Sequence, residues 1–253
     1  MSTKGAHTLP RFLVQRLGDK GDQAVLSAGE SHHLARVLRL RPGDRVSVFD
    51  GRGREFVARI VQADRAAATV SLVARVENSL EPRVPFSLVQ SLLKGPAMDE
   101  VIRDATMMGA SSIEPVLTSH VAVKSPLQST SALLDRWQRV ALASAKQCRR
   151  AVLPVVHRPR RFEEWLASTE HALRLLFVEP SADLPARPLR AFVGAAQPAT
   201  AALIVGPEGG WSPDELEAAL SAGCVPVTLG RLTLRADAVA LTAAALFRFV
   251  WDD

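Results

Sequence analysis

The chain has few cysteines and lacks any long apolar run. Only Cys148 and Cys224 occur among its 253 residues, without the paired spacing of a zinc site. We expect both to be buried free thiols, with no disulfide and no metal. Charged residues or glycines interrupt every apolar run before the ~20 residues that a membrane helix needs, and residues 1–9 lack the apolar core of a signal peptide. The sequence therefore predicts a cytoplasmic protein without a membrane partner.

The common sequence signatures of cofactor and catalytic sites are also missing. No strand-like run is followed by Gly-x-Gly-x-x-Gly, and the chain has no P-loop, no Gly-x-Ser-x-Gly and no His-Glu-x-x-His. These absences argue against a dinucleotide-dependent dehydrogenase, a P-loop nucleotidase, a serine hydrolase of the α/β type and a zinc protease. Any site must be sought in less common loops.

Positive charge is concentrated in the first third of the chain. The formal net charge is +5, and residues 1–80 hold 13 Lys and Arg against 8 Asp and Glu, whereas residues 81–253 hold 18 of each. A basic domain predicts a polyanion partner such as RNA, because neutralised phosphates release their counterions. The alternative is that the arginines only solvate the surface of an arginine-rich protein.

The first third has the pattern of a small β domain. Asp50-Gly51 lies between two strand-like runs and predicts a hairpin, with Gly53 indicating a loop longer than two residues. Apolar residues then alternate with other residues over 56–60 and again over 70–76, as in half-buried strands. Several short strands at this spacing predict a small barrel.

One helix is expected within this domain, from Ser31 as its cap to Leu40. Leu34, Val37 and Leu38 would share its buried face. Two arginines three residues apart would lie on a neighbouring face, where they could contact RNA phosphates, although exposed arginines on a helix are commonly just solvated. The predicted RNA-binding residues are Arg11, Arg36, Arg39 and Arg41.

A proline-containing linker over residues 78–85 separates this predicted domain, residues 1–77, from a second one, residues 86–253. Beyond the linker, continuous apolar runs alternate with helical patterns, which predicts an α/β domain with a mostly parallel sheet. The predicted strands are 86–90, 113–117, 173–178, 201–205 and 225–229. The predicted helices are 97–108, 133–149, 162–167, 213–221 and 237–250.

Two of these strands end in glycine, at the sheet edge where open parallel sheets bind ligands. Residues 206–210, Gly-Pro-Glu-Gly-Gly, follow the first strand; the glycines let the backbone approach a ligand, while Glu208 argues against a phosphate. An adenosine ligand with a positive centre fits better. A capping box from Ser212 to Glu215 fixes the far end of this loop.

The second loop, residues 229–237, alternates leucines with arginines and then enters a strongly apolar helix. A loop this apolar must be buried, pack against a partner, or line a pocket for a flat apolar group such as adenine.

The two loops together resemble the paired cofactor loops of the SPOUT methyltransferases. Val205-Gly-Pro-Glu-Gly-Gly-Trp-Ser and Leu229-Gly-Arg-Leu-Thr-Leu-Arg-Ala-Asp-Ala carry the resemblance. The segments His33-Leu-Ala-Arg-Val-Leu-Arg-Leu-Arg-Pro-Gly-Asp44 and Ala145-Lys-Gln-Cys-Arg-Arg extend it over nearly the whole chain. Within that superfamily, the chain is similar to the bacterial family that methylates uridine N3 in 16S ribosomal RNA.

The chain departs from that family's pattern at three places. Met107-Met108 stands where the family usually has Glu-Leu, and Lys146 where it has Glu. Ala236-Asp237-Ala238 replaces the usual Thr-Glu-Thr. This last change shortens a carboxylate and removes two hydroxyls beside the predicted site.

The resemblance implies a fold, a cofactor and a reaction. The fold would be a PUA-like β-barrel followed by a SPOUT-type α/β domain with a deep trefoil knot. S-adenosylmethionine would bind within the knot of a homodimer. The reaction would be methylation of uridine N3 near the decoding region, at the 3′ end of 16S ribosomal RNA in a 30S particle.

The resemblance also assigns site residues. The predicted catalytic residues are Arg235 and Asp237. Arg235 would stabilise charge on the deprotonated uracil, with a structural ion pair to Asp237 as the alternative, and Glu208 or Asp237 would lie near the sulfonium or the methionine amine. The predicted cofactor-binding residues are Leu203, Val205, Gly206, Pro207, Glu208, Gly209, Gly210, Leu229, Gly230, Leu232 and Leu234.

Two other functions stay open at this point. One is a non-catalytic RNA-binding factor of ribosome assembly with the same fold, which would bind RNA but no S-adenosylmethionine. The other is a small-molecule α/β enzyme with an incidental basic domain, which would bind no RNA.

Overall fold

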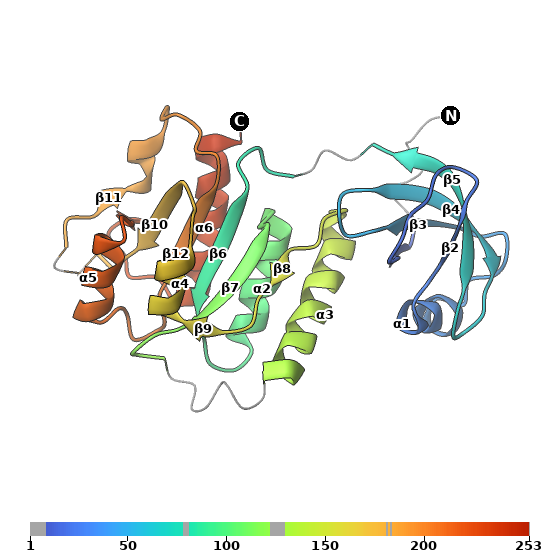
Figure 1. Ribbon diagram of the computed structural model, residues 1–253, viewed down its shortest axis with the longest axis horizontal. Coiled ribbons are helices and arrows are strands. Elements are labelled where there is room, and N and C mark those ends of the chain that lie inside the picture. Colours follow the sequence, from blue (N-terminus) through green and yellow to red (C-terminus); the bar gives the residue numbers. More distant parts are fainter. Residues whose placement is uncertain (1–8, 78–80, 122–129, 181, 183, 253) are drawn as a thin grey trace. The chain divides into compact units, whose positions relative to one another are not determined.

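The computed structural model describes residues 9–77, 81–121, 130–180, 182 and 184–252. The chain divides into two compact units, Met1–Glu81 with Ala145–Leu153, and Pro82–Ser144 with Pro154–Asp253 (Figure 1). Part of the predicted linker, residues 78–80, lies outside the described residues. The chain thus returns to the first unit in the middle of its course, over a segment that the division predicted from the sequence assigns to the second domain.

The first unit is built on a five-stranded sheet in the order β1-β3-β4-β5-β2. Its strands are β1 (Arg11–Leu13), β2 (Gln23–Val25), β3 (Arg45–Phe49), β4 (Glu55–Gln62) and β5 (Thr69–Val76). Neighbouring strands are antiparallel except for β1, which runs parallel to β3. Alternate side chains such as Phe12, Val48 and Ile60 face a common core.

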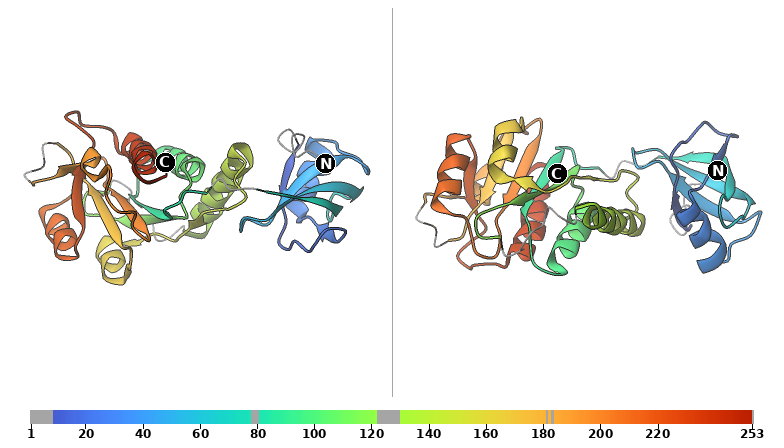
Figure 2. Two further views of the ribbon diagram at one scale, coloured as in Figure 1. Left: turned by 90° about the horizontal axis from the view of Figure 1, so that it is seen from above. Right: turned by 60° about the horizontal axis from the view of Figure 1, so that its bottom comes forward.

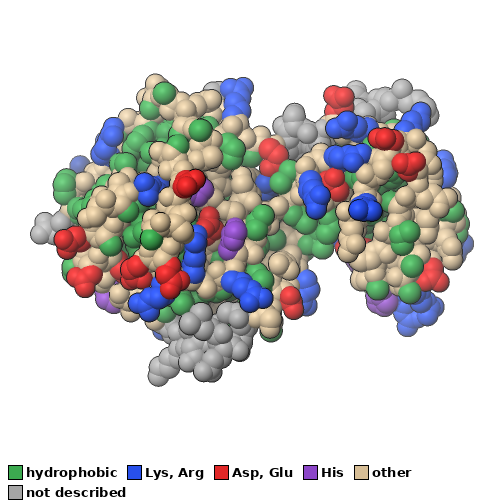
Figure 3. Space-filling view, viewed as in Figure 1, with side chains coloured by type: hydrophobic (Ala, Val, Ile, Leu, Met, Phe, Trp, Pro, Cys, Tyr) green, Lys and Arg blue, Asp and Glu red, His purple; other side chains and the backbone are tan. Residues whose placement is uncertain are grey.

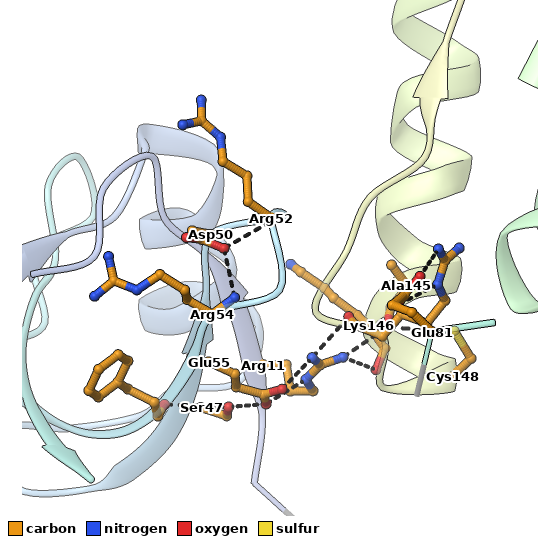
Figure 4. A network of polar contacts seen from close by, with 12 residues as sticks. Arg11, Ser47, Asp50, Arg52, Arg54, Glu55, Glu81, Ala145, Lys146 and Cys148 are labelled. Atoms are coloured by element: carbon orange, nitrogen blue, oxygen red, sulfur yellow. Dashed lines mark hydrogen bonds and ion pairs between the residues drawn. The ribbon is translucent and has the colours of Figure 1, made fainter. Parts of the chain in front are cut away.

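The predicted hairpin is confirmed between β3 and β4, where Phe49 pairs with Glu55. Its loop is longer than two residues, and the side chain of Asp50 accepts the backbone N–H groups of Arg52 and Arg54 (Figure 4). Gly53 has a φ of 101°, in the left-handed region that favours glycine.

The helix of the first unit begins four residues before the predicted start. It consists of α1 (Ala28–His32) followed by a π-helical turn, η2 (His33–Val37). Ser27, and not Ser31, is the N-cap, and its hydroxyl accepts the N–H of Glu30. Ser31 is fully buried, where its hydroxyl accepts the N–H of Ala68, so the predicted cap is wrong.

The π turn also changes which side chains face the core. Leu38 N–H donates to the carbonyl of His33, five residues back, so this turn holds more residues than an α-helical one. Leu34 is buried as predicted, but Val37 and Leu38 are exposed. The expected apolar face of the helix is therefore wrong for two of its three residues.

The second unit contains an eight-stranded sheet in which β11-β13-β10-β12-β6-β7-β8 are neighbours in that order and β9 also pairs with β7. Every strand pair described in this sheet is parallel, as predicted. The strands are β6 (Phe86–Ser91), β7 (Ser112–Leu117), β8 (Val155–Val156), β9 (Arg160–Arg161), β10 (Leu173–Phe177), β11 (Arg187–Pro188), β12 (Ala201–Val205) and β13 (Val225–Thr228).

Helices cover both faces of this sheet (Figure 2). They are α2 (Ala97–Met108), α3 (Thr130–Cys148), α4 (Phe162–Ser168), α5 (Pro213–Ser221) and α6 (Ala236–Trp251), with a 3₁₀ turn, η3 (Leu189–Phe192). One core lies under α2 and α6 and includes Leu203 and Phe247. The other lies under α4 and α5 and includes Trp165 and Ile204.

The five predicted strands and five predicted helices of the second domain are all present. Three of them, Ala97–Met108, Ala201–Val205 and Pro213–Ser221, have the predicted bounds. The short strands β8, β9 and β11 were not predicted, because two residues are too few for a periodic pattern. The trefoil knot stays a prediction.

Both cysteines are free thiols, as expected. Cys224 is buried, and burial raises the pKa of its thiol to about 11, so it stays protonated at neutral pH. Cys148 is only partly buried, which corrects the expectation for that residue. None of the described helices is long and apolar enough to span a membrane.

Candidate functional site

The carboxyl ends of three neighbouring strands, β10, β12 and β13, open onto a cavity of about 520 Å³. This volume is in the range of sites for small molecules and cofactors. The loops after the three strands form most of its wall, which is completed by Leu93, between β6 and α2, and by Ala97, the first residue of α2. The predicted site residues in the wall are Val205, Gly206, Pro207, Glu208, Gly209, Gly210, Leu229, Leu232, Leu234, Arg235 and Asp237.

Two of the predicted cofactor-binding residues do not line this cavity. Leu203 lies in the middle of β12 and is fully buried in the core. Gly230 lines a separate cavity of about 180 Å³ between η3, the end of β13 and α6. A direct ligand contact is therefore not supported for either residue in the larger cavity.

The glycine loop, residues 206–211, is closely packed against its own neighbours. A Cβ at Gly206 would lie 3.0 Å from the indole of Trp211, whose Nε1 donates to the carbonyl of Phe177. Gly210 has a φ of 71° and its N–H donates to the carbonyl of Pro207. The loop thus requires glycine at both positions, once for space and once for backbone conformation.

The predicted capping box at the end of this loop is confirmed. Glu215 N–H donates to the hydroxyl of Ser212, and the carboxylate of Glu215 accepts the N–H of Ser212 at 2.9 Å. The other end of the loop is held through Glu208, whose carboxylate accepts the N–H of Lys94 at 3.3 Å. The glycine loop is therefore fixed on both sides of the cavity.

The second predicted loop is more exposed than its apolar composition suggested. Leu232 is 79% exposed and Leu234 is also exposed, although both line the cavity. Arg235 is the residue before α6, with an 81% exposed side chain that forms an ion pair with Asp237 in the first turn. The two predicted catalytic residues are thus direct partners of each other.

Sequence reasoning missed the third loop, which follows β10. Val178, Glu179, Pro180 and Ala182 all line the cavity, and a Cβ at Gly210 would lie 3.4 Å from the carboxylate of Glu179. A signal was available, because the predicted strand over 173–178 is parallel to the other two. Its carboxyl end must therefore lie at the same edge of the sheet.

The charges around the cavity are mostly negative. Among the described residues, its wall contains the carboxylates of Glu179, Glu208 and Asp237 and a single cationic side chain, that of Arg235. Such a site favours a ligand with a positive centre over a phosphate. Among the residues that the structure describes, no group of three His, Cys, Asp or Glu side chains could hold a metal ion.

The four predicted RNA-binding arginines fall into two groups. Arg36, Arg39 and Arg41 are exposed, and none of their guanidinium groups forms an ion pair within the described residues. Arg39 lies beyond the end of the π turn and has a φ of 54°, so it is not part of the helix. The prediction that Arg36 and Arg39 share one helix face is therefore wrong. Figure 3 shows basic side chains on the first unit with acidic ones among them.

Arg11 is a structural residue, which corrects its predicted role in RNA binding. It is only 6% exposed, and its guanidinium donates twice to the carboxylate of Glu55 (Figure 4). It also donates to the backbone carbonyls of Ala145 and Arg150, which belong to the same unit. Because these donors are engaged and almost none of its surface is exposed, Arg11 is not available to bind a phosphate.

Comparisons with known proteins agree with this architecture. Residues 80–248 match a family model described as an RNA methyltransferase domain, and residues 26–73 match one described as an RNA methyltransferase PUA domain. Two relatives named ribosomal RNA small subunit methyltransferase E are similar in sequence. The Synechocystis protein is 35% identical over 87% of this chain and 71% of its own length. The Mycobacterium tuberculosis protein is 34% identical over 95% of this chain and 93% of its own.

Two solved structures are similar over almost the entire chain. One is a ribosomal RNA small subunit methyltransferase E from Neisseria gonorrhoeae bound to S-adenosyl methionine, with a TM-score of 0.85 and 26% identity over 96% of this chain and 98% of that one. The other is a putative methyltransferase from Legionella pneumophila in complex with the same cofactor, with a TM-score of 0.87 and 25% identity over 95% and 97%.

Proposed function

The chain belongs to the ribosomal RNA small subunit methyltransferase E family, and from this we propose that it methylates N3 of a uridine in 16S ribosomal RNA. The methyl donor in this proposal is S-adenosylmethionine. The observation that carries it is the cavity at the ends of β10, β12 and β13, whose wall holds three carboxylates and the two loops that resemble the family's cofactor loops.

The composition of the cavity fits this cofactor. S-adenosylmethionine has a flat adenine and two cationic groups, a sulfonium and an amine, and when bound it supplies an activated methyl group. Leu229, Leu232 and Leu234 line the cavity and would contact the adenine, while Glu208 and Glu179 of the same wall would neutralise the cationic groups. The glycines of the 206–211 loop let backbone atoms come close to the ligand.

The substrate atom sets the remaining requirements. N3 of uracil carries a proton and normally takes part in base pairing, so the target base must be unpaired or turned out of its helix. Arg235 lies at the cavity rim and can stabilise the negative charge of a deprotonated uracil. The exposed arginines Arg36, Arg39 and Arg41 of the first unit would bind the RNA backbone.

We further propose that two copies of the chain form a homodimer through the second unit. Six of its exposed apolar side chains belong to the second loop, η3 and α6 or lie next to them: Val193, Leu232, Leu234, Leu241, Leu246 and Phe249. Exposed apolar residues gathered on a few neighbouring elements indicate an interface. The face would be covered by the same face of a second copy, since isologous dimers are the commonest oligomers.

The experiment is methyl transfer from labelled S-adenosylmethionine to small-subunit particles and to naked 16S ribosomal RNA, followed by mass spectrometry of the digested product. We expect one 3-methyluridine near the 3′ end, formed on the 30S particle in the cytoplasm. Reverse transcription should stop at this base, since its pairing edge carries the methyl group. Label on a ring carbon or a ribose oxygen would refute the assignment to N3.

The non-catalytic alternative predicts RNA binding without cofactor binding. An assembly factor has no need for an acidic cavity of this volume at the ends of three strands, so the geometry favours the enzyme. Calorimetry with S-adenosylmethionine separates the two: micromolar binding supports the enzyme, and no heat of binding at millimolar cofactor supports the assembly factor.

A further inference from the structure

We propose that His120 is a positioning residue for the methyl-donor site, because its imidazole fixes the orientation of backbone groups in the glycine loop. This inference rests on the proposed function, since it concerns the same cavity. His120 does not line the cavity itself and lies behind the loop, in the turn that follows β7. Neither the sequence pattern nor the paired-loop resemblance singles it out.

The imidazole of His120 contacts two consecutive carbonyl groups of the loop. Its Nδ1 lies 3.1 Å from the carbonyl oxygen of Gly209 and 3.2 Å from that of Gly210. A carbonyl oxygen can only accept a hydrogen bond, so Nδ1 must carry the hydrogen in both contacts. The tautomer is thereby fixed, and in the neutral ring Nε2 is left as an acceptor.

These contacts determine where the next amide groups of the loop point. All peptide bonds described are trans, and in a trans peptide the C=O and the following N–H point in opposite directions. With the Gly210 carbonyl turned to His120, the N–H of Trp211 must point away from His120. Trp211 lines the cavity, and its backbone N–H donates to no acceptor in the described residues. In this proposal, an acceptor atom on the bound cofactor takes this unpaired N–H.

The turn that presents His120 is itself held in place. The hydroxyls of Thr118 and Ser91 are 2.6 Å apart, and the N–H of Ser119 donates to the carboxylate of Glu215 at 2.6 Å. Glu215 is the buried residue of the α5 capping box, so the turn and the far end of the glycine loop share one anchor. Contacts of Thr118 and Ser119, the two residues before His120, thus fix the position of the turn from which the imidazole extends.

The loop is shaped to receive this side chain. A Cβ at Gly209 would lie only 2.9 Å from the Cβ of His120, closer than non-bonded carbon atoms approach each other in proteins. Glycine at this position is therefore required by the presence of His120. Gly209 and His120 therefore depend on each other. A substitution of either residue would displace the carbonyl groups that determine the orientation of the Trp211 N–H.

The test uses three substitutions that differ only in where they place a donor. Asparagine puts its amide nitrogen close to the position of Nδ1, glutamine puts it near Nε2, and alanine provides none. For His120→Ala we expect the KM and the Kd for S-adenosylmethionine to rise roughly tenfold, the cost of about one hydrogen bond in the site, with kcat for the ribosomal substrate changed much less. His120→Asn should restore the cofactor affinity to within about threefold, and His120→Gln should not. His32→Ala, which removes an exposed histidine of the first unit, is the matched control and should bind the cofactor as the wild type does.

Three outcomes overturn the inference. His120→Ala with unchanged cofactor affinity removes any role for the contacts. Equal losses in the Ala, Asn and Gln variants, in step with a lower melting temperature, would show a packing role without donor specificity. Wild-type protein that binds no S-adenosylmethionine refutes the proposed function and the inference together, whereas wild-type protein that binds it but methylates no ribosomal RNA refutes only the proposed function.

Discussion

Arg235 and Asp237 form a two-point ion pair, with Nε 3.2 Å from Oδ1 and Nη2 3.1 Å from Oδ2. The guanidinium is mostly exposed, so the pair contributes little to stability and opens at little cost. Both residues line the cavity. The arrangement holds a cation at the rim that can exchange its carboxylate partner for negative charge on a substrate.

Arg235→Ala should therefore impair the reaction more than the fold. We expect kcat to fall roughly 100-fold, because this is about the effect of removing one group that stabilises developing negative charge. The Kd for S-adenosylmethionine should stay within about twofold. Single-turnover methyl transfer and calorimetry measure the two quantities separately. Asp237→Asn keeps the guanidinium and should retain more activity; equal losses in both variants, with a lower melting temperature, would make the pair structural.

The exposed arginines of the first unit give a second prediction. Arg36→Ala combined with Arg39→Ala should weaken RNA binding and lower the magnitude of the slope of log K against log salt by about 1.4, as expected for two lost contacts to single-stranded phosphates. Fluorescence anisotropy at several salt concentrations measures this slope. Arg65→Ala combined with Arg75→Ala removes the same charge from other exposed positions of this unit. An equal loss in this control would indicate general charge attraction without a specific face.

Local signals allowed accurate prediction where the deciding contacts are close in sequence. The capping box of Ser212 and Glu215 is formed by residues three apart, and the hairpin loop after Phe49 is stabilised by Asp50. The five helices of the second unit and its five longer strands follow from patterns that the local sequence shows in full, whereas the two-residue strands β8, β9 and β11 do not. The site could be placed because the ends of parallel strands meet at one edge.

Three of the errors arise where contacts between residues distant in sequence determine the structure. Ser31 has the residue type and position of a cap, but its hydroxyl accepts the N–H of Ala68, 37 residues away. Arg11 was predicted to bind RNA, but its guanidinium is buried and donates to the carboxylate of Glu55. It also donates to two backbone carbonyls more than 130 residues away. His120 was passed over because its partners, Gly209 and Gly210, lie 89 and 90 residues further on. A local sequence pattern cannot show contacts between residues that are this far apart in the chain.

A buried carboxylate away from the cavity gives a pH-dependent prediction. Burial alone would raise the pKa of Glu114, but the nearby His171 and His157 and the hydrogen bonds from Trp165 and Arg160 lower it from 4.5 to about 2. A depressed pKa means that its stabilisation is complete above about pH 5 and is lost as the pH falls toward 2.

Glu114→Gln should therefore lower the free energy of unfolding at pH 7 by on the order of 3 kcal/mol, the equivalent of this pKa shift. The difference from the wild type should shrink between about pH 4.5 and pH 2. Urea unfolding at pH 7, 5, 4 and 3 measures it. A difference that is the same at every pH would show that lost packing, and not the charge, is responsible.

The proposed homodimer is tested at its most exposed aromatic side chain. Phe249 in α6 is 65% exposed, and Phe249→Glu would place a charge in the proposed interface, where an unpaired charge costs several kcal/mol. We expect the wild type to sediment as a dimer and the variant as a monomer. Val155→Glu introduces the same charge at an exposed apolar residue of β8 and should stay dimeric. Wild-type protein that is monomeric at about 10 μM would contradict the proposal.

Glu208 has two separable roles, as the acceptor for Lys94 N–H and as a negative charge in the cavity wall. Glu208→Gln keeps an oxygen for the N–H and removes only the charge, whereas Glu208→Ala removes both. If the carboxylate faces the sulfonium, Glu208→Gln should weaken S-adenosylmethionine about tenfold and S-adenosylhomocysteine, which lacks that charge, only about twofold.

Calorimetry with both ligands decides between these roles, with Glu217→Gln, an exposed carboxylate of α5, as the control for net charge. Equal weakening of the two ligands would assign the charge to the amine that both share. A glutamine variant with wild-type affinities, beside an alanine variant that binds poorly, would leave only the hydrogen bond to Lys94. In that case recognition of the sulfonium must come from Glu179 or Asp237, the other two carboxylates of the wall.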